Sequence, residues 1–217
     1  LRCNFQSMPE KVRNPIFARL YTIIARHESE REGEFRRRLL DGASGRVVEV
    51  GAGSGANFGN YPPGVTEVVA VEPEPYMRKQ ASNAAAAAPV PVEVRSGTAE
   101  ALPAGDDEFD VAVVSLMLCS VPDQAAALTE IGRVLRPGGE LRFYEHVISR
   151  KPGMARTQRV FDRTFWPHVA GGCHCARDTA SAIERAGFAI ESCHREAFQA
   201  APILPPFPHI VGVARRP

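Results

Sequence analysis

The fold of this protein is decided by the stretch Arg46-Val47-Val48-Glu49-Val50-Gly51-Ala52-Gly53-Ser54-Gly55. The first half is a β-branched run, which predicts a short buried strand. The second half places three glycines at alternate positions, so the chain can turn tightly and a ligand can approach its backbone. A strand that leads through such a turn into a helix is a usual opening of a parallel α/β sheet.

Strand and helix signals alternate along the rest of the chain. We expect strands over residues 46–50, 68–71, 92–95, 110–116, 140–146, 188–192 and 209–214, and helices over residues 15–25, 28–40, 74–88, 124–135, 160–166 and 178–186. Parallel strands joined by helices are covered on both faces, which explains their continuous apolar character. The sequence therefore predicts an α/β protein with a doubly wound, Rossmann-like, mostly parallel sheet of seven strands and helices on both faces.

Composition excludes several classes of protein. The chain has 217 residues, and its 26 lysines and arginines balance 25 aspartates and glutamates, for a net charge of +1. This length suits a single domain, and the balanced charge offers no excess of cations for a nucleic-acid backbone. The basic run at residues 36–38 is interpreted as a solvated helix face, because glutamates on the same segment can pair with it. The longest apolar run, residues 111–121, is shorter than the roughly 20 residues needed to cross a bilayer. We therefore expect neither a nucleic-acid nor a membrane partner.

Five cysteines are an odd number in a chain too large to depend on disulfide bonds. We interpret them as reduced thiols, which predicts a cytoplasmic protein. Cys173-His174-Cys175 and Cys193-His194 invite comparison with metal sites, but their spacing does not match the usual zinc-binding hooks. No metal is therefore expected. Residues 1–7 resemble a remnant of cloning, which leaves residues 8–217 as one domain.

The glycine turn by itself fits two kinds of cofactor site. Gly51, Gly53 and Ala56 also satisfy the G-x-G-x-x-G/A fingerprint of dinucleotide-binding enzymes. Glu72, at the end of the second predicted strand, could accept hydrogen bonds from ribose hydroxyls in either case. The turn alone therefore leaves a nicotinamide-dependent oxidoreductase open.

Further motifs favour one of these two kinds of cofactor site. The acid and glycines at Glu49, Gly51, Gly53 and Gly55 resemble motif I of the class I S-adenosylmethionine (SAM)-dependent methyltransferases. In the order typical of that family follow Gly97-Thr98-Ala99-Glu100, a strand at residues 109–116, and Leu135-Arg136-Pro137-Gly138-Gly139. This resemblance covers about residues 47–146 and implies an enzyme that uses SAM as cofactor and a small molecule as methyl acceptor. A module that only binds the sulfonium ligand is an alternative.

The resemblance also implies the cofactor contacts. SAM is a sulfonium zwitterion without phosphates, so its site needs an acid for the ammonium, an acceptor for the ribose and apolar contact for the adenine. Glu49 is the candidate acid for the ammonium, and Glu72 is the candidate acceptor for the ribose. The expected cofactor-binding residues are Glu49, Gly51, Gly53, Gly55, Asn57, Glu72, Pro73, Met77, Thr98, Ala99, Ser115 and Leu116.

A narrower resemblance concerns the methyl acceptor. Motifs at residues 118–121, 144–147, 172–173 and 208–210 look like the methyltransferase-like 7 group of thiol S-methyltransferases and its soluble bacterial relatives. This resemblance implies methyl transfer to a thiol sulfur. The alternative is an O- or N-methyltransferase for a small aromatic or quinone-like metabolite, because the same cofactor half would serve both.

The acceptor is expected to bind outside the cofactor-binding core, residues 46–147. His146, at the carboxyl end of the fifth predicted strand, is the candidate general base or thiolate-orienting group, with a buried structural histidine as the alternative. The N-terminal helices, residues 8–42, would form a helical lid, and residues 149–179 would cover the substrate. From these segments we name Tyr21, Trp166 and His168 as candidate substrate contacts and His174 as a second candidate catalytic residue.

Overall fold

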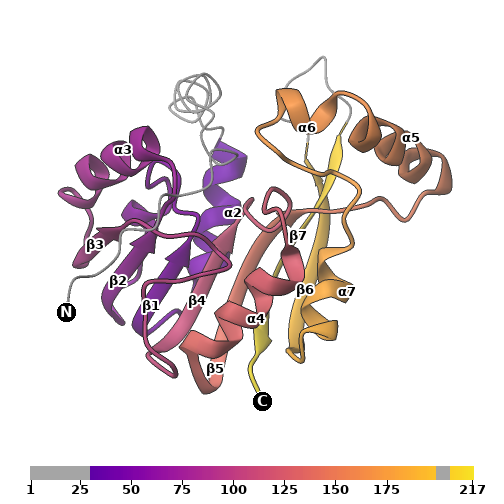
Figure 1. Cartoon of the computed structure of the whole chain (residues 1–217). Coiled ribbons are helices and arrows are strands. Elements are labelled where there is room, and N and C mark those ends of the chain that lie inside the picture. The colour runs from indigo at the N-terminus through magenta and orange to yellow at the C-terminus, as the bar shows by residue number, and fades with distance from the viewer. Residues whose placement is uncertain (1–29, 199–205) are drawn as a thin grey trace.

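The computed structural model describes residues 30–198 and 206–217, and in these ranges seven strands form one sheet (Figure 1). The strands are β1 (Gly45–Val50), β2 (Val65–Val71), β3 (Val92–Arg95), β4 (Phe109–Ser115), β5 (Leu135–His146), β6 (Ala189–Phe198) and β7 (Phe207–Arg215). The helices are α2 (Glu30–Leu40), η2 (Phe58–Asn60), α3 (Pro75–Ala85), α4 (Gln124–Val134), α5 (Pro152–Arg163), α6 (Trp166–Val169) and α7 (Thr179–Arg185).

The sheet is mostly parallel, as predicted. Its strand order is β3-β2-β1-β4-β5-β7-β6, in which β1 to β5 are parallel and β7 is antiparallel to both β5 and β6. The direction of winding reverses between β1 and β4, and ligands of such sheets bind beyond the carboxyl ends of the strands at this switch point. The doubly wound, Rossmann-like fold is therefore confirmed, and the glycine turn after β1 lies at the binding edge.

Helices cover both faces of the sheet (Figure 1). On one face, α4 and α7 pack in a core that includes Val48 and Ala112 of the central strands. On the other face, α2 and α3 pack in a core that includes the preceding residues, Val47 and Val111. Because successive side chains of a strand point to opposite faces, a strand buried on both sides needs apolar residues throughout.

Helix starts follow from local capping. The Glu74 carboxylate accepts a hydrogen bond from the Met77 N–H at the start of α3, where Pro75 occupies the first turn. Asp123 accepts from two N–H groups in the first turn of α4, and Asp178 accepts from one in α7. These caps set where each helix leaves the sheet edge, so they also set the position of the loops that carry the site.

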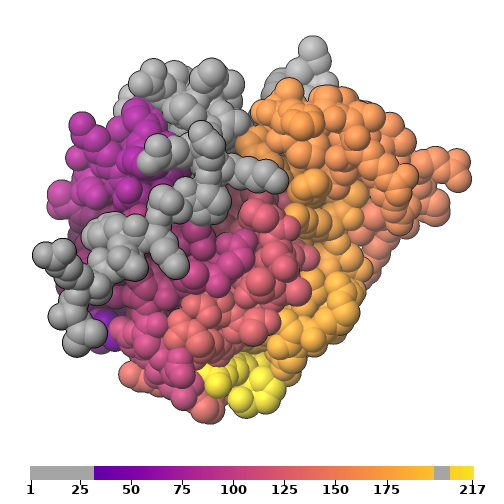
Figure 2. Space-filling model, viewed as in Figure 1, coloured from indigo at the N-terminus to yellow at the C-terminus, as the bar shows by residue number. Residues whose placement is uncertain are grey.

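Several predicted element bounds are wrong, and the strand expected over residues 188–192 extends to Phe198 as β6. The helix expected over residues 160–166 is instead divided into α5 and α6, because a proline stands in the first turn of each. β5 begins at Leu135 rather than at residue 140, and its pairing with β4 jumps from Leu135 to Glu140. Residues 136–139 therefore form a bulge within β5. In the space-filling view, the orange segment with α5 and α6 forms a lobe on one side of the molecule (Figure 2).

The proposed lid lies mostly outside the described residues. Tyr21 and the helix expected over residues 15–25 belong to that part of the chain. Of the predicted N-terminal helices, α2 is described, and it packs against β5 and β7. The division of residues 8–217 into lid, cofactor-binding core and covering segment stays a prediction.

Candidate active site

The glycine turn after β1 has a backbone that glycine adopts most easily. Gly51 and Gly53 have φ angles of +71° and +58°, in the left-handed region. A side chain at Gly51 would collide with Met117, whose Cγ lies 2.4 Å from the position of the added Cβ. At Gly53, no described atom lies within 4 Å of that position. The turn is closed at Gly51 and open at Gly53, which fits a ligand lying against the backbone.

Glu72 ties this turn to the end of β2. Its two carboxylate oxygens accept hydrogen bonds from the Gly53 and Glu74 N–H groups, both at 2.8 Å. The side chain is buried, and burial raises the pKa of the carboxyl above its usual value. Each carboxylate oxygen can accept more than one hydrogen bond, so Glu72 keeps capacity for ribose hydroxyls while it shapes the turn.

Glu49 lies beneath the turn in a buried hydrogen-bond network. The Tyr61 hydroxyl and the Asn57 amide donate to its two oxygens at 2.6 and 2.9 Å. Burial raises the pKa of Glu49 to about 7, although the bonds from Tyr61 and Asn57 and the charge of Arg36 oppose this rise. An acid that changes charge near neutral pH therefore lies under the binding edge.

Arg36 completes the network, and its assignment to a solvated helix face is wrong. The guanidinium donates to Asn57 Oδ1 at 2.9 Å and to Ser115 Oγ at 3.2 Å, and the residue is only 7% exposed. It thereby joins α2, the glycine turn and the end of β4. A buried cation at this point suits the carboxylate of an amino-acid ligand.

Helical spacing is the signal that could have identified Arg36. The buried apolar residues of α2 are Phe35, Leu39 and Leu40. Arg36 lies on the same stripe as these residues, three and four positions from the last two. Arg37 falls on the opposite face and is exposed. The sequence shows the spacing, but only the packing of α2 shows which arginine is buried.

The residues expected around the adenine follow β2 and β3. Met77 is buried in the first turn of α3, and Pro73 is half-buried just before that helix. Thr98 and Ala99 lie in the turn after β3, where Thr98 pairs with Ala101 and Ala99 is buried. Because parallel strands end at one edge, these residues lie on the same edge of the sheet as the glycine turn.

The turn after β4 is held by one buried carboxylate. Glu145 of β5 accepts hydrogen bonds from the N–H groups of Met117, Leu118 and Cys119 at 2.9, 2.8 and 3.0 Å. The turn begins at Leu116, whose φ of +55° is unusual for a branched side chain. Glu145 therefore fixes the backbone that carries Cys119 and positions Leu116, a predicted cofactor contact.

Cys119, His146 and Cys173 meet at the carboxyl ends of β4 and β5. The Sγ atoms of Cys173 and Cys119 lie 3.5 and 4.0 Å from His146 Nδ1, and the three atoms lie within 4.8 Å of one another. A hydrogen bond from Cys119 and the nearby His146 lower the pKa of the Cys173 thiol below its usual value, although burial opposes this shift. Two thiols and an imidazole therefore lie together where the sequence predicts the acceptor.

Trp166, His168 and His174 lie in the segment after β5 but face different surroundings. Trp166 packs on Phe207 with 5.3 Å between ring centroids, and Phe207 lies edge-on to His146 at 6.4 Å. His168 is exposed. The Nδ1 atom of His174, a half-exposed side chain, lies 3.7 Å from an oxygen of Asp162. Of these three predicted residues, Trp166 is the one that packs, through Phe207, beside the cysteine–histidine cluster.

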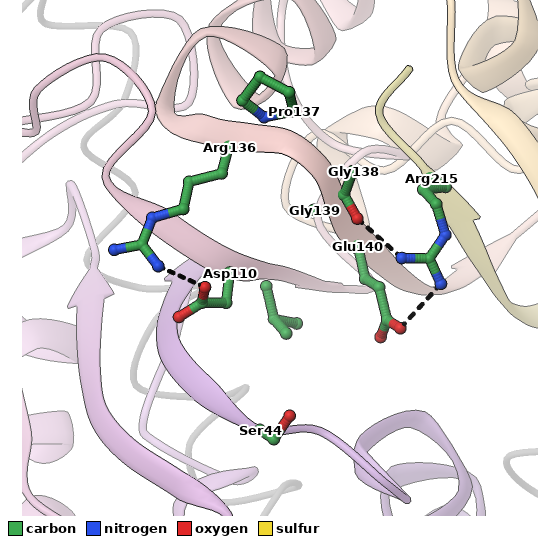
Figure 3. A pocket seen from close by; sticks show the side chains of 9 residues that line it. Ser44, Asp110, Arg136, Pro137, Gly138, Gly139, Glu140 and Arg215 are labelled. Carbon is green, nitrogen blue, oxygen red and sulfur yellow. Dashed lines mark hydrogen bonds and ion pairs between the residues drawn. The ribbon is translucent and has the colours of Figure 1, made fainter.

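A pocket of about 200 Å³ lies at the opposite edge of the sheet, lined by the starts of β4 and β5 and the end of β7 (Figure 3). Ion pairs join Arg136 to Asp110 and Arg215 to Glu140 at this pocket (Figure 3). These charges satisfy one another, and the glycine turn lies at the other end of the strands. The pocket is therefore not assigned to the cofactor.

The open turn at Gly53, the acid that follows β2 and the switch-point position form a site of the class that binds a cofactor through its ribose, and comparison with known proteins decides which cofactor class it is. A family model described as a methyltransferase domain matches residues 48–143. Human thiol S-methyltransferase TMT1B is 39% identical over 183 residues, which cover 81% of this chain and 73% of that protein. Human TMT1A is 34% identical over 216 residues, which cover 92% of this chain and 84% of TMT1A. The chain belongs to the family of these methyltransferases.

A solved structure shows the same fold. The YcgJ protein of Bacillus subtilis superposes with a TM-score of 0.68 at 17% identity, covering 85% of this chain and 97% of that one. This likeness shows the fold, and membership of the methyltransferase family gives SAM as the cofactor, so the nicotinamide-dependent alternative is set aside. Within residues 30–198 and 206–217, no helix combines the length and the apolar character required to span a bilayer.

Proposed function

We propose that this enzyme transfers the methyl group of SAM to the thiol sulfur of a small molecule. The observation that carries the proposal is the 39% identity to human TMT1B, whose name describes a thiol S-methyltransferase, over most of both chains. The cluster of Cys119, His146 and Cys173 supports it, because sulfur and imidazole groups line the edge beyond β4 and β5. The balanced net charge also favours a small acceptor over a nucleic acid.

The cofactor half of the proposal assigns a role to each polar group of the switch point. When bound, SAM supplies an electrophilic methyl group on a positively charged sulfur. Glu72 would hold the ribose, and the open backbone at Gly53 would lie against the amino-acid end. Arg36 would attract the carboxylate of that end, and the negative charge of Glu49 would favour its ammonium.

The acceptor half requires mainly positioning. A free thiol with a pKa near 8.5 is already a few per cent thiolate at neutral pH and is a good nucleophile. Holding the sulfur in line with the methyl group could lower the barrier by roughly 7–11 kcal/mol. We assign His146 to orienting the thiolate, because its Nδ1 already lies near two sulfur atoms. Trp166 and residues 149–179 would cover the acceptor.

A transfer assay with matched acceptors tests the acceptor atom. The purified chain is incubated with SAM carrying a labelled methyl group and with a thiol, a phenol and an amine built on the same aromatic ring. We expect label in the thioether and background levels in the ether and the methylamine. Label in the phenol or amine product, with none in the thioether, would overturn the proposed thiol specificity.

Cofactor affinity should depend on pH through Glu49. Its pKa of about 7 in the folded chain exceeds the usual carboxyl value, so lowering the pH below 7 protonates it and removes its negative charge. The ammonium of SAM prefers the ionised form, and the groups that face Glu49 are Arg36, Tyr61 and Asn57. We therefore expect the Kd for SAM to rise by up to about fivefold between pH 7 and pH 6.

Calorimetry of SAM binding at pH 6, 7 and 8 checks this expectation. The control is Glu49→Gln, which keeps the shape of the side chain but cannot ionise. Its Kd should vary less with pH than that of the wild-type chain. An equal pH dependence in both proteins would show that another group is responsible.

The stability of the folded chain should change with pH in the opposite direction to its affinity for SAM. Between the usual carboxyl pKa and about 7, Glu49 is ionised in the unfolded chain and protonated in the folded one. The folded state therefore binds more protons, and its free energy of unfolding should decrease as the pH rises through this window. Thermal unfolding of the wild-type chain and of Glu49→Gln across the same window measures the difference.

We also propose that the protein works in a reducing compartment, the cytoplasm. Cys119, Cys173 and Cys175 are buried free thiols, and Cys193 is an exposed free thiol. Two of these sulfur atoms lie within 4.8 Å of each other without forming a disulfide. Free thiols of this kind persist where the cellular thiol pool is reduced. Cell fractionation with an antibody against the chain checks the location.

A further inference from the structure

Three ligand-type atoms at the acceptor edge have the spacing of a tetrahedral metal site. In such a site, a metal–sulfur distance of about 2.3 Å and a metal–nitrogen distance of about 2.0 Å place neighbouring ligand atoms roughly 3.5–3.8 Å apart. The two Sγ–Nδ1 distances here are 3.5 and 4.0 Å, and the three atoms lie within 4.8 Å of one another. Side-chain shifts of up to about 1 Å would bring Cys119, His146 and Cys173 to one ion.

These atoms come from three segments that the fold holds rigidly. Three backbone hydrogen bonds to Glu145 fix the turn that carries Cys119. His146 is the last residue of β5 and pairs with His209 of β7. The segment that carries Cys173 is joined to the Cys119 turn, because the His174 N–H donates to the Cys119 carbonyl at 2.8 Å. The site is therefore largely preorganised.

A second hydrogen bond joins the Cys119 turn to the segment that carries Cys173. The Arg177 guanidinium donates to the Leu118 carbonyl at 2.6 Å, just beside Cys119. Cys175, two residues after Cys173, faces elsewhere, with its Sγ 3.2 Å from an oxygen of Asp162. The Cys-His-Cys sequence at residues 173–175 therefore does not bind a metal as one unit. Only Cys173 of this sequence lies beside Cys119 and His146, which are distant in the chain. The spacing of the motif alone cannot reveal this grouping.

We propose that Cys119, His146 and Cys173 bind one Zn²⁺ ion, and that the sulfur of the acceptor thiol takes its fourth position. The second part rests on the proposed function. Two sulfur ligands and one imidazole suit a borderline-soft ion such as Zn²⁺. Three protein ligands leave one position open, as in zinc sites that bind a substrate. A thiol that binds there loses its proton, so the nucleophile forms at neutral pH.

The transfer step balances without an oxidant or reductant. The acceptor thiol releases its proton to solvent as its sulfur binds the ion. A lone pair of that sulfur forms the new bond to the methyl carbon, while the bond from this carbon to the sulfonium breaks and its electrons stay on the departing sulfur. The products are neutral S-adenosylhomocysteine and a thioether. A thioether is a weaker ligand than a thiolate, which lets the product leave.

Aromatic rings pack beside His146 at one side of the cluster. The rings of His146 and His209 lie 4.3 Å apart between centroids, and Phe207 lies edge-on to His146 at 6.4 Å. Trp166 packs on Phe207. A thiol attached to an apolar body would contact these rings while its sulfur reaches the ion. This arrangement favours hydrophobic thiols over charged ones.

Zinc binding is measured on the whole chain without any methyl transfer. The purified protein is stripped with a chelator and titrated with Zn²⁺ in competition with a chromophoric chelator. We expect one ion per chain. Replacement of a ligand should weaken binding by more than the roughly 10–100-fold seen when only a supporting residue is lost. The variants are Cys119→Ser and Cys173→Ser, and the matched controls are Cys175→Ser and Cys193→Ser.

A second measurement does not depend on the folding of variants. Co²⁺ added to the stripped wild-type chain should give the charge-transfer and d–d bands of a tetrahedral thiolate site, and an aromatic thiol should shift them. No stoichiometric zinc binding, or equal losses in the control variants, would overturn the proposal. A Cys119–Cys173 disulfide that forms in mild oxidant, in a chain that binds no zinc, would replace it with a redox pair.

The two proposals fail in different ways. If the stripped chain methylates thiols at the full rate, the zinc-bound acceptor is wrong and thiol methylation stands. If zinc binds with the expected ligand pattern but only phenols or amines are methylated, thiol methylation is wrong and the metal site stands without its thiol ligand. Reactivation of a slow stripped chain by one equivalent of Zn²⁺ is the result expected.

Discussion

Replacing Glu72 by Gln is expected to weaken SAM binding by about 100-fold. The two carboxylate oxygens face the N–H groups of Gly53 and Glu74, at 2.8 Å each. A glutamine offers one oxygen and one NH₂ group, so one of these backbone donors would face another donor. The same change removes the negative charge that would accept the ribose hydroxyls. Hydrogen bonds to charged groups contribute about 1.5–3 kcal/mol each, and every 1.4 kcal/mol is about tenfold in Kd.

The matched control is Glu67→Gln, in the strand β2 that directly precedes Glu72. Glu67 lies nearer the start of β2 and pairs with Arg46 at the other end of the sheet, at 2.8 Å. Calorimetry with SAM should give a Kd close to that of the wild-type chain for Glu67→Gln. The thermal shift produced by SAM should nearly vanish in Glu72→Gln alone, because a ligand stabilises only the state it binds. Equal affinities in the two variants would contradict the assignment of Glu72.

Replacing Arg36 by Met should lower both stability and cofactor affinity. The change keeps the apolar stem of the side chain but removes the hydrogen bonds to Asn57 and Ser115 and the cation that opposes the raised pKa of Glu49. Breaking such a buried polar network costs about 3 kcal/mol. In a chain of this length, that loss lowers the Tm by roughly 6–12 °C.

Arg37→Met on the same helix separates this effect from a general loss of charge. Arg37 is exposed on the opposite face of α2, and exposed substitutions usually change stability by less than about 0.5 kcal/mol. Thermal unfolding and SAM calorimetry are measured on both variants at one pH. The role of Arg36 would be disproved if the two variants had the same Tm and the same Kd for SAM.

The cofactor half of the site is predictable from the sequence because its signals are local. A glycine with a positive φ, an acid at the end of a strand and a cap at the start of a helix are set by a few neighbouring residues. Local patterns therefore single out Glu49, Gly51, Gly53 and Glu72 as candidate cofactor contacts, and parallel strands bring these residues to one edge. Glu72 reaches the Gly53 N–H across 19 positions of the chain, as this sheet order requires.

The burial of Arg36 is not predictable in the same way. Three arginines in a row have the same local propensity, and which one is buried depends on how α2 is rotated against β5 and β7. The energy that decides this rotation comes from Phe35, Leu39 and Leu40 entering the core. A charged side chain beside the apolar stripe can be buried when polar partners in the interior satisfy its charge.

The amino-acid sequence is sufficient for the class of fold, the glycine turn and the family, because strand periodicity and turn chemistry act over short distances. The three-dimensional packing alone brings Cys173 to Cys119 and His146 while Cys175 turns to Asp162. Cys119 follows β4, His146 ends β5, and Cys173 lies 27 positions after His146. Contacts at such separations are set by strand order and by the packing of the segment after α6. That packing depends on the whole core, which no local pattern contains.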